Sequence, residues 1–265
     1  MSTLKFLKFN STNFPYTHLA DKRTQQWLLV ASFSDMVSLV ALYLLLVLYL
    51  PKWMQRRKPF QLKPLLLLYN LCMVLLNAHI CKELIFNGIR LKYNLWCQPC
   101  RELYSKEELK IAAAVWWFYF SKLLEFADTI FFILRKKHEQ ITFLHVFHHC
   151  TMFPLWWIAI KWVPTGSTIV PSTINSFIHV IMYSYYGLSA FGPSVQKFIW
   201  WKKYLTILQL VQFVFGAFWS AQAILRGCDF PTWINFVTIG YMASLLLLFG
   251  QFYVKAYQTK KNKHY

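Results

Sequence analysis

The chain has 265 residues, of which 57% are hydrophobic and 19% aromatic but only 14% charged. A soluble protein of this length carries about 25% charged residues, so the composition excludes an ordinary soluble domain. Only eight glycines and ten prolines are present, which excludes a loop-rich or low-complexity architecture. The sequence shows no phosphate-binding glycine loop and no zinc-type cysteine pairing. It therefore predicts an all-helical membrane protein without a nucleic-acid partner.

Seven apolar stretches are long enough, or nearly so, to cross a bilayer as helices, which requires about 20 residues. In chain order they are 27–50, 64–86, 111–134, 141–162, 168–191, 204–225 and 232–254. The extreme N-terminus lacks the apolar core of a cleavable signal peptide, so we expect the first span to remain in the mature protein. The chain then divides into an N-terminal segment (1–26), a seven-span domain (27–254) and a basic tail (255–265).

The distribution of basic residues predicts the orientation of these spans. Segments 51–63, 135–140, 192–203 and 255–265 together hold fifteen Lys or Arg and one acid. The opposite side, which comprises 1–26, 87–110, 163–167 and 226–231 with Lys161 at a helix end, holds eleven basic residues and five acids. Because basic residues in short loops favour the cytosolic side, we expect a lumenal N-terminus and a cytosolic C-terminus.

Two short signals agree with this orientation. An Asn-Ser-Thr glycosylation sequon occupies residues 10–12, on the predicted lumenal side. In the tail, the spacing of Lys261 and Lys263 resembles the dilysine signal that retrieves membrane proteins to the endoplasmic reticulum. The alternative is a basic tail that binds the anionic cytosolic leaflet. The first interpretation predicts a multi-pass protein of the endoplasmic-reticulum membrane.

The third span carries a polar face. Ionisable side chains inside a transmembrane helix are costly, and they mark a functional interior. At about 100° per residue, a single arc of about 120° holds these side chains. They are Lys122, Glu125, Asp128 and Thr129. The alternatives are a lysine that reaches the membrane interface and an internal ion pair that only fixes helix packing.

The fourth span places three imidazoles in an apolar, aromatic run. His145, His148 and His149 stand at i, i+3 and i+4, within an arc of about 100°. A single histidine in such a helix would be a packing residue, whereas three on one face indicate a functional cluster.

The fifth and sixth spans also carry polar stripes. The stripe of the fifth span comprises Asn175, His179, Tyr183 and Tyr186. Its tyrosines could form an interfacial belt, but the stripe runs three turns deep rather than lying at one depth. The stripe of the sixth span comprises Thr206, Gln209 and Gln212, and interhelical hydrogen bonding alone is the alternative for these groups. Because lipid cannot solvate four polar faces, we expect the spans after the first to enclose a narrow cavity, with the first packed outside.

Three kinds of chemistry fit such a cavity. The histidines with Glu125 and Asp128 could ligate iron, as in di-iron desaturases and hydroxylases, although those sites use about eight histidines. A seven-span receptor or a transporter is a weaker alternative, because receptor motifs and transporter-type repeats are absent from the sequence. Acyl transfer is the third, since a neutral imidazole is both a nucleophile and a general base.

Four motifs resemble those of a known family. "KLLEFADT", "HVFHH", "NSFIHVIMYSYY" and "TILQLVQ" look like the signature motifs of the ELO fatty-acid elongases, in the expected order. The resemblance implies the condensing step of very-long-chain fatty-acid elongation, in which acyl-CoA and malonyl-CoA give 3-oxoacyl-CoA, carbon dioxide and CoA. It also implies a closed tunnel within six helices and no metal or other cofactor. The ketoreductase, dehydratase and enoyl-reductase of the cycle would be membrane partners.

The resemblance assigns roles to the polar residues. His148 is the predicted nucleophile, which carries the acyl chain as an acyl-imidazole. His179 and Asn175 are expected to stabilise the enolate formed on decarboxylation, with Lys122 a weaker candidate. The neighbouring groups would orient the nucleophile or move protons, and they are His145, His149, Glu125 and Asp128. In a non-covalent alternative, the histidines only transfer protons and polarise the substrate.

The remaining assignments concern substrate binding. Tyr183, Tyr186, Thr206, Gln209 and Gln212 are expected to contact substrate inside the cavity. The phosphates of CoA should meet the basic residues at the cytosolic helix ends, unless these only set topology. They are Arg135, Lys136, Lys137, Lys202, Lys203 and Lys255.

Three cysteines lie on the predicted lumenal side, where an oxidising compartment permits disulfides. Cys97 and Cys228 are candidates to join the loops after the second and sixth spans, and Cys100 is a competing partner. The acyl tail would then run toward a closed lumenal end. The sequence does not determine the acyl chain length, the preference for saturated chains, or whether the protein is a homo-oligomer.

Overall fold

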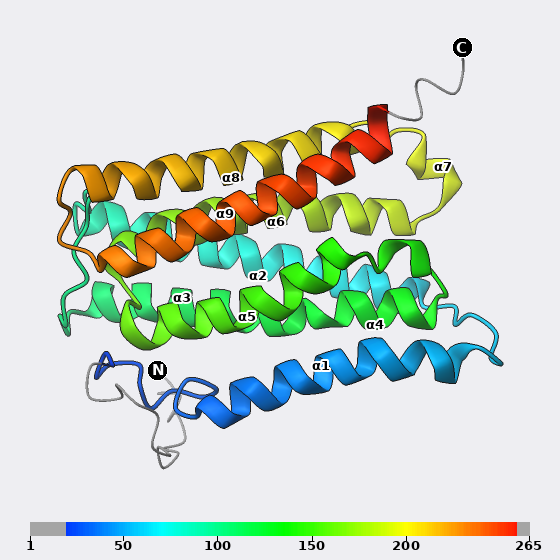
Figure 1. Ribbon diagram of the computed structural model, residues 1–265, viewed down its shortest axis with the longest axis horizontal. Helices are drawn as coiled ribbons and strands as arrows, with labels where there is room; N and C mark the ends of the chain where they lie inside the picture. The colour runs from blue at the N-terminus through cyan, green and yellow to red at the C-terminus, as the bar shows by residue number, and fades with distance from the viewer. Residues whose placement is uncertain (1–19, 259–265) are drawn as a thin grey trace. The chain divides into compact units, whose positions relative to one another are not determined.

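The computed structural model describes residues 20–258, and every regular element in this range is a helix (Figure 1). The long helices are α1 (Phe33–Met54), α2 (Lys63–Arg90), α3 (Lys106–Leu124), α4 (Phe126–Leu134), α5 (Phe143–Trp162), α6 (Ile169–Ala190), α8 (Lys202–Leu225) and α9 (Thr232–Tyr253). The short ones are α7 (Pro193–Gln196), the 3₁₀ turns η2 (His138–Gln140) and η3 (Gly166–Thr168), and the π-helical turn η4 (Val254–Gln258). The all-helical prediction is confirmed. The sequon and the dilysine-like signal lie outside the described residues.

Five helices are long and apolar enough to cross a membrane: α1, α2, α5, α8, and α9 with η4. The protein is therefore a multi-pass membrane protein. The predicted third and fifth spans are also helical, as α3 with α4 and as α6.

The predicted third span, 111–134, differs from the structure in two respects. The helix begins earlier, at Lys106, where Ser105 Oγ accepts a hydrogen bond from the backbone N–H of Glu108 at 3.2 Å. It is then interrupted at Glu125, between α3 and α4. Glu125 has a ψ of −19°, and its carbonyl accepts from the backbone N–H of Asp128 at 3.2 Å. This bond has 3₁₀ spacing, which tightens one turn inside the helical run.

The first helix begins six residues later than the predicted start at 27. Leu29 has a φ of 62°, a left-handed conformation that ends any helix before it. Ser32 then caps α1, with its Oγ accepting from the backbone N–H of Asp35 at 3.2 Å. Residues 20–31 therefore form a strap of turns that precedes α1.

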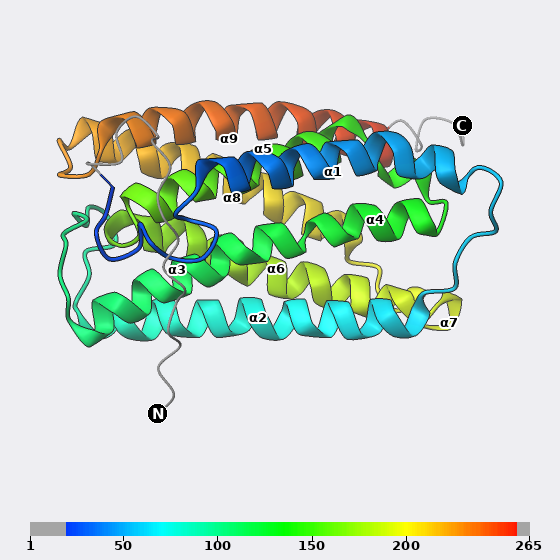
Figure 2. The ribbon, with the colours of Figure 1, turned by 90° about the horizontal axis from the view of Figure 1, so that it is seen from below.

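The described chain forms two compact units, and α2 contributes to both. The first unit contains residues 20–62, Glu83–Lys92 and Cys100–Ile169. In it, α3 packs on α5, and α1 packs on α4 and α5 (Figure 2). The second unit contains Lys63–Lys82, Tyr93–Pro99 and residues 170–258, with α8 packed along α9.

In the first unit, a buried arginine fixes the strap. The Arg23 guanidinium binds Asp21 at 2.6 Å, Thr165 Oγ1 at 3.0 Å and the carbonyl of Leu103 at 3.0 Å. Burial by itself lowers the pKa of Arg23, but the hydrogen bond and charge of Asp21 more than offset this and leave the pKa above its ordinary value. Burial raises the pKa of the neighbouring Cys100 thiol, despite hydrogen bonds from Thr165. The strap is thus attached through a charged group that stays ionised.

A buried lysine makes the second attachment of the strap. Lys161, near the end of α5, is 2% exposed. Its ammonium donates to the carbonyls of Val30 and Ala31 at 3.0 and 3.1 Å and lies 5.0 Å from the Trp157 ring centroid. The strap is therefore attached to α5 through directed bonds.

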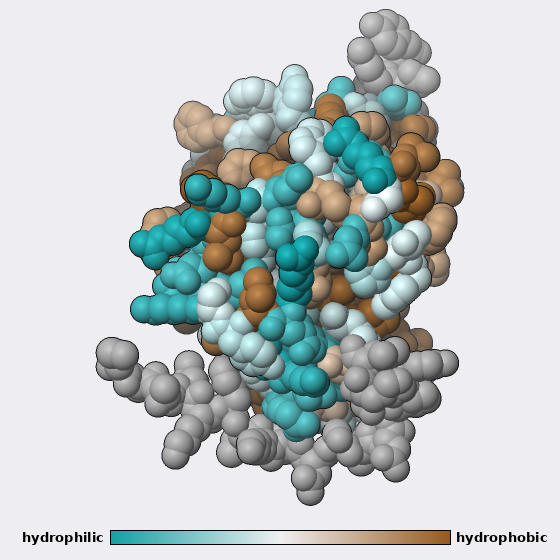
Figure 3. Space-filling model, turned by 90° about the vertical axis from the view of Figure 1, so that its left-hand side faces the viewer, coloured by the Kyte–Doolittle hydropathy of each residue, from teal (hydrophilic) through white to brown (hydrophobic). Residues whose placement is uncertain are grey.

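The second unit has an apolar core and a disulfide. Met73, Met182, Tyr183 and Leu205 form a buried cluster from α2, α6 and α8. The loops after α2 and α8 lie at the left of Figure 1. Figure 3 looks onto this side, where hydrophilic residues gather.

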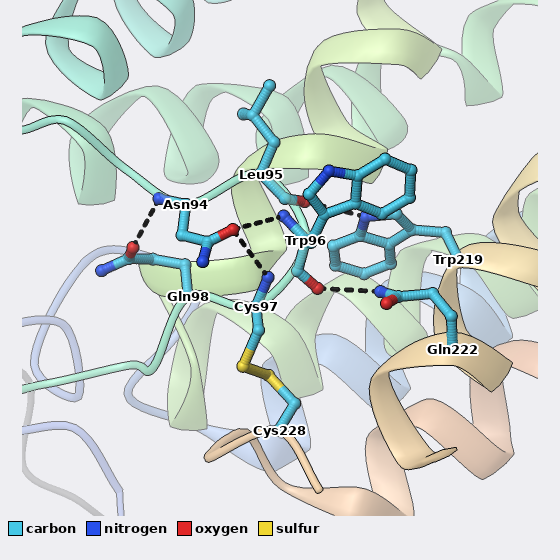
Figure 4. The surroundings of a disulfide bond; sticks show 8 residues. All are labelled: Asn94, Leu95, Trp96, Cys97, Gln98, Trp219, Gln222 and Cys228. Carbon is cyan, nitrogen blue, oxygen red and sulfur yellow. Dashed lines mark hydrogen bonds between the residues drawn. A yellow bond between two sulfur atoms is a disulfide. The ribbon is translucent and has the colours of Figure 1, made fainter. Parts of the chain in front are cut away.

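A bond between Cys97 and Cys228 joins these two loops, with their Cα atoms 5.5 Å apart (Figure 4). Two side chains of α8 bind the loop after α2 as well. Trp219 Nε1 donates to the Leu95 carbonyl at 2.9 Å, and Gln222 Nε2 donates to the Trp96 carbonyl at 2.8 Å. The disulfide thus reinforces a loop that α8 already holds.

Candidate active site

The three imidazoles of the predicted cluster lie together on α5. Thr142 caps this helix, with its Oγ1 accepting from the backbone N–H of His145 at 3.2 Å. The ring centroids of His145 and His149 are 4.4 Å apart, and those of His148 and His149 are 5.5 Å apart. His149 is 8% exposed, and the other two are half-buried. The i, i+3, i+4 spacing thus produces one compact group of rings.

Aromatic side chains from α1 and α4 surround the innermost imidazole. The ring centroid of His149 lies 6.4 Å from that of Tyr43 and 6.5 Å from that of Phe126. Tyr43 and Phe126 stack on each other at 4.3 Å. These contacts exclude water from one side of the cluster, which strengthens electrostatic interactions there.

A buried ion pair lies at the interruption between α3 and α4. Lys122 Nζ donates to Glu125 Oε1 at 2.8 Å, and the two side chains are 1% and 2% exposed. The same ammonium lies 4.4 Å from the Phe118 ring centroid. Such an internal ion pair is one of the alternative interpretations of the polar face of the third span. Asp128, on the next turn, is half-buried.

Two hydroxyls reach the histidine cluster from other helices. Thr129 Oγ1 on α4 lies 2.7 Å from His145 Nε2 and 3.0 Å from the hydroxyl of Tyr43 on α1. Tyr43 is 2% exposed. Sequence reasoning missed Tyr43, because it predicts that the first span packs outside the cavity. The available signal was one hydroxyl in the aliphatic run "LVALYLLLV".

The stripe of the fifth predicted span lies on α6, in the second unit. Asn175 and His179 are buried. The buried ring of Tyr183 lies 5.8 Å from His179 and 5.9 Å from Tyr186, between centroids. Tyr186 is 38% exposed, so the stripe reaches the surface at its end.

The stripe of the sixth predicted span lies on α8 of the same unit. Gln209 Nε2 donates to the sulfur of Met182 at 3.6 Å. Thr206 Oγ1 lies 3.5 Å from the hydroxyl of Tyr257, and Gln212 is half-buried. Gln209 of the α8 stripe thus contacts α6 at Met182, which is a neighbour of the α6 stripe on the same helix. The convergence of all four polar faces stays a prediction.

The basic residues of the predicted cytosolic side also occur in both units. In the first, Arg135 and Lys136 are half-buried and Lys137 is exposed, with Lys136 Nζ donating to the Gln55 carbonyl at 3.1 Å. In the second, the exposed ones are Lys202, Lys203 and Lys255. No group of three or more His, Cys, Asp or Glu within residues 20–258 is placed to hold a metal ion.

Comparison with known proteins matches this chain to one family along most of its length. Residues 28–265 match the family described as ELO: GNS1/SUR4. Very long chain fatty acid elongase 4 of Homo sapiens is 49% identical over 243 residues, which cover 92% of this chain and 77% of the relative. Very long chain fatty acid elongase 5 of Rattus norvegicus is 45% identical over 240 residues, covering 91% of this chain and 80% of the relative. Very long chain fatty acid elongase 2 of Mus musculus is 45% identical over 243 residues, covering 92% and 82%. With this agreement over nearly its whole length, the chain belongs to the ELO (GNS1/SUR4) family.

Proposed function

We propose that this protein catalyses the condensing step of fatty-acid elongation and is a 3-oxoacyl-CoA synthase. Its substrates are a long-chain acyl-CoA and malonyl-CoA. The observation that carries the proposal is the 49% identity to a very long chain fatty acid elongase over 92% of the chain. The cluster of three imidazoles on α5 supplies the nucleophile and bases that acyl transfer requires.

The reaction proceeds in two stages. In the first, His148 attacks the thioester carbon of the acyl-CoA, the carbon–sulfur bond breaks, and CoA leaves with a proton. In the second, malonyl-CoA loses carbon dioxide, and the electron pair of the broken carbon–carbon bond becomes an enolate. The enolate carbon attacks the acyl-imidazole, the carbon–nitrogen bond breaks, and His148 is regenerated. One proton is consumed overall, and no metal or cofactor takes part.

The neighbouring residues of the first unit assist the nucleophile. His145 is held by Thr129, and His149 is buried between aromatic rings, so these two imidazoles have fixed orientations. The half-buried His148 is the member of the cluster that we assign to the acyl group. Glu125 and Asp128 stabilise charged or tautomeric states of the cluster.

The second unit contributes groups that stabilise the enolate and bind the chain. Asn175 and His179 are the proposed donors to the thioester oxygen on which negative charge develops, with Lys122 of the first unit a weaker candidate. Met182 and Tyr183 belong to a buried apolar cluster, and the acyl chain is proposed to run beside it. Tyr186, Thr206, Gln209 and Gln212 complete the proposed lining.

We further propose seven spans, six of which enclose a tunnel with a closed lumenal end. Two of the seven proposed spans, namely α6 and the pair of α3 with α4, are less apolar than the other five. Their helical structure supports their assignment as spans. The basic residues at the helix ends named above bind the CoA phosphates at the cytosolic mouth. The protein acts in the endoplasmic-reticulum membrane beside a ketoreductase, a dehydratase and an enoyl-reductase.

The direct test incubates purified protein with an acyl-CoA and labelled malonyl-CoA and measures a 3-oxo product two carbons longer. Failure to form this product would overturn the proposal. Metal analysis of the same sample tests the di-iron alternative, because stoichiometric iron would favour it.

A second experiment tests the covalent route. With malonyl-CoA left out, the wild-type protein should release CoA from acyl-CoA up to one equivalent, whereas His148→Ala should release none. The matched control is His138→Ala, which alters an exposed histidine in η2. CoA release by His148→Ala at the wild-type rate would exclude His148 as the nucleophile.

A further inference from the structure

Two buried hydroxyls connect α1 to the histidine cluster. The Tyr43 hydroxyl lies 3.0 Å from Thr129 Oγ1, which lies 2.7 Å from His145 Nε2. Tyr43 and Thr129 are 2% and 1% exposed. The three groups therefore form a chain of two hydrogen bonds, in which the two hydroxyl side chains are closed to bulk water and the imidazole is half-buried.

Counting hydrogens gives the direction of this chain. Among the described residues, Thr129 is the only hydrogen-bond partner of the Tyr43 hydroxyl, so Tyr43 must donate to Thr129 to satisfy its own hydrogen. Thr129 then has one hydrogen left, and His145 Nε2 is the acceptor within reach. In the reverse direction, the Tyr43 hydrogen would be buried without an acceptor, which is costly. His145 Nε2 consequently accepts, and the ring proton of neutral His145 is on Nδ1.

We propose that Tyr43 and Thr129 are positioning residues that hold His145 in the Nδ1–H tautomer and fix its ring beside His149. This proposal rests on the proposed function, because it concerns how the histidine cluster is oriented for acyl transfer. Since the Nε2 lone pair of His145 is occupied by Thr129, this nitrogen is not the nucleophile. His145 acts instead by orienting its neighbour, whose ring centroid lies 4.4 Å away.

The local structure explains how two helices place these hydroxyls. Thr129 follows Glu125 by one helical turn on α4. The helix that begins beside the Lys122–Glu125 ion pair therefore also directs the Thr129 hydroxyl toward His145 on α5. Tyr43 is held by stacking on Phe126, with the ring centroids 4.3 Å apart. Its hydroxyl position is thereby fixed by packing as well as by the hydrogen bond.

The first test is spectroscopic and uses the full-length protein in detergent, without substrates. Nitrogen-15 labelling of histidine distinguishes protonated from unprotonated ring nitrogens, and His145→Gln identifies the signal of His145. We expect the Nε2 of His145 to be unprotonated in the wild type and in Thr129→Ser, which keeps the hydroxyl. In Thr129→Val, a protonated Nε2 signal should appear because the tautomer is no longer held. If the neutral ring of His145 carries its proton on Nε2 in the wild-type protein, the proposal is overturned. This measurement needs only the wild type and His145→Gln, which assigns the signal.

The second test is kinetic. Thr129→Val and Tyr43→Phe should lower kcat by about 10- to 100-fold, as the loss of residues that orient a functional histidine does elsewhere. The KM for both substrates should stay unchanged, and Thr129→Ser should retain kcat. If Tyr43→Phe and Thr129→Val raise KM and leave kcat unchanged, the hydroxyls contribute to binding or packing only, and the positioning role is excluded. Thermal melting of each variant shows whether it is folded, and Tyr43→Phe keeps the stacking ring if Thr129→Val fails to fold.

The two tests separate this inference from the proposed function. The tautomer is measured without substrate, so it can hold even if no 3-oxo product forms. Conversely, the protein can elongate acyl-CoA while His145 shows a protonated Nε2. In that case the function stands and the positioning role fails.

Discussion

In the first unit, charged and imidazole groups are held by short directed bonds, whereas in the second Gln209 of the α8 stripe contacts the sulfur of Met182. Lys122 and Glu125 pair at 2.8 Å, and Thr129 binds His145 at 2.7 Å. In the second unit, Gln209 Nε2 donates to the sulfur of Met182 at the longer distance of 3.6 Å. Short charge-assisted bonds fix geometry, while methionine adapts its shape.

This difference suggests a division of labour within the proposed reaction. Bond-making steps need groups held in fixed orientations before substrate arrives, as in the first unit. An acyl chain presents only methylene groups, and it needs an apolar surface rather than directed bonds. The cluster of Met73, Met182, Tyr183 and Leu205 is apolar and buried. Four substitutions examine whether the two units depend on these different forces.

Breaking the ion pair of the first unit should have the largest effect. Glu125→Gln leaves the Lys122 ammonium buried without its counter-charge, and we expect a loss of about 3–5 kcal/mol in the free energy of unfolding. The measurement is thermal melting of the purified protein in detergent. The double variant Lys122→Met with Glu125→Gln removes both charges and should recover much of the loss.

The matched control for this prediction is Glu107→Gln. Glu107 is partly exposed and lies 3.9 Å from Arg90, whose side chain is 54% exposed. Because exposed pairs contribute little, this variant should melt close to the wild type. Equal destabilisation by Glu107→Gln and Glu125→Gln would show that burial of the pair is not what makes it important.

Removing the covalent link of the second unit should have the next largest effect. Cys228→Ser opens the disulfide to Cys97, which closes a separation of 131 residues. Disulfides typically contribute about 2–4 kcal/mol, although Trp219 and Gln222 also hold the loop and should reduce the loss. Thermal melting with and without a reductant measures it. Cys100→Ser is the control, because Cys100 forms no disulfide. If Cys100→Ser lowers the melting temperature without a reductant but not with one, then Cys100 rather than Cys97 or Cys228 takes part in the disulfide.

Periodicity and hydropathy were sufficient to predict most of the helices. Each of the seven apolar stretches contains a helix. Five of the helices are long and apolar enough to cross a membrane, where backbone hydrogen bonds must be satisfied within the segment. The interruption at Glu125 and the late start of α1 were not predicted. Both depend on one residue's backbone conformation, Glu125 in one case and Leu29 in the other, in sequences that are otherwise suited to helices.

The candidate site was predicted where its residues share a helical face and missed where they come from distant segments. The imidazoles of α5 are close because of their spacing alone. Tyr43 is 86 residues from Thr129, and Lys161 is 131 residues from Val30. Partners at such separations are decided by tertiary packing, which no local pattern contains.

The attachment of the strap in the first unit should have an intermediate effect. Lys161→Met keeps the length of the side chain but removes the donor to the carbonyls of Val30 and Ala31. Leaving buried acceptors unsatisfied should cost about 1–3 kcal/mol, measured by thermal melting. Lys106→Met, at an exposed position, should be neutral. A neutral Lys161→Met would show that the strap does not depend on the bonds of Lys161 and is held by its other attachments, including that of Arg23.

The smallest effect is expected in the apolar cluster of the second unit. Met182→Leu conserves volume but removes the sulfur that accepts from Gln209 Nε2 at 3.6 Å. If shape rather than this bond stabilises the cluster, the cost should stay below about 1.5 kcal/mol. Met182→Ala, which opens a cavity, should cost about 2–5 kcal/mol. Should both variants lower the melting temperature equally, the contact with Gln209 would be a directed bond after all, and the two units would be stabilised by the same kind of force.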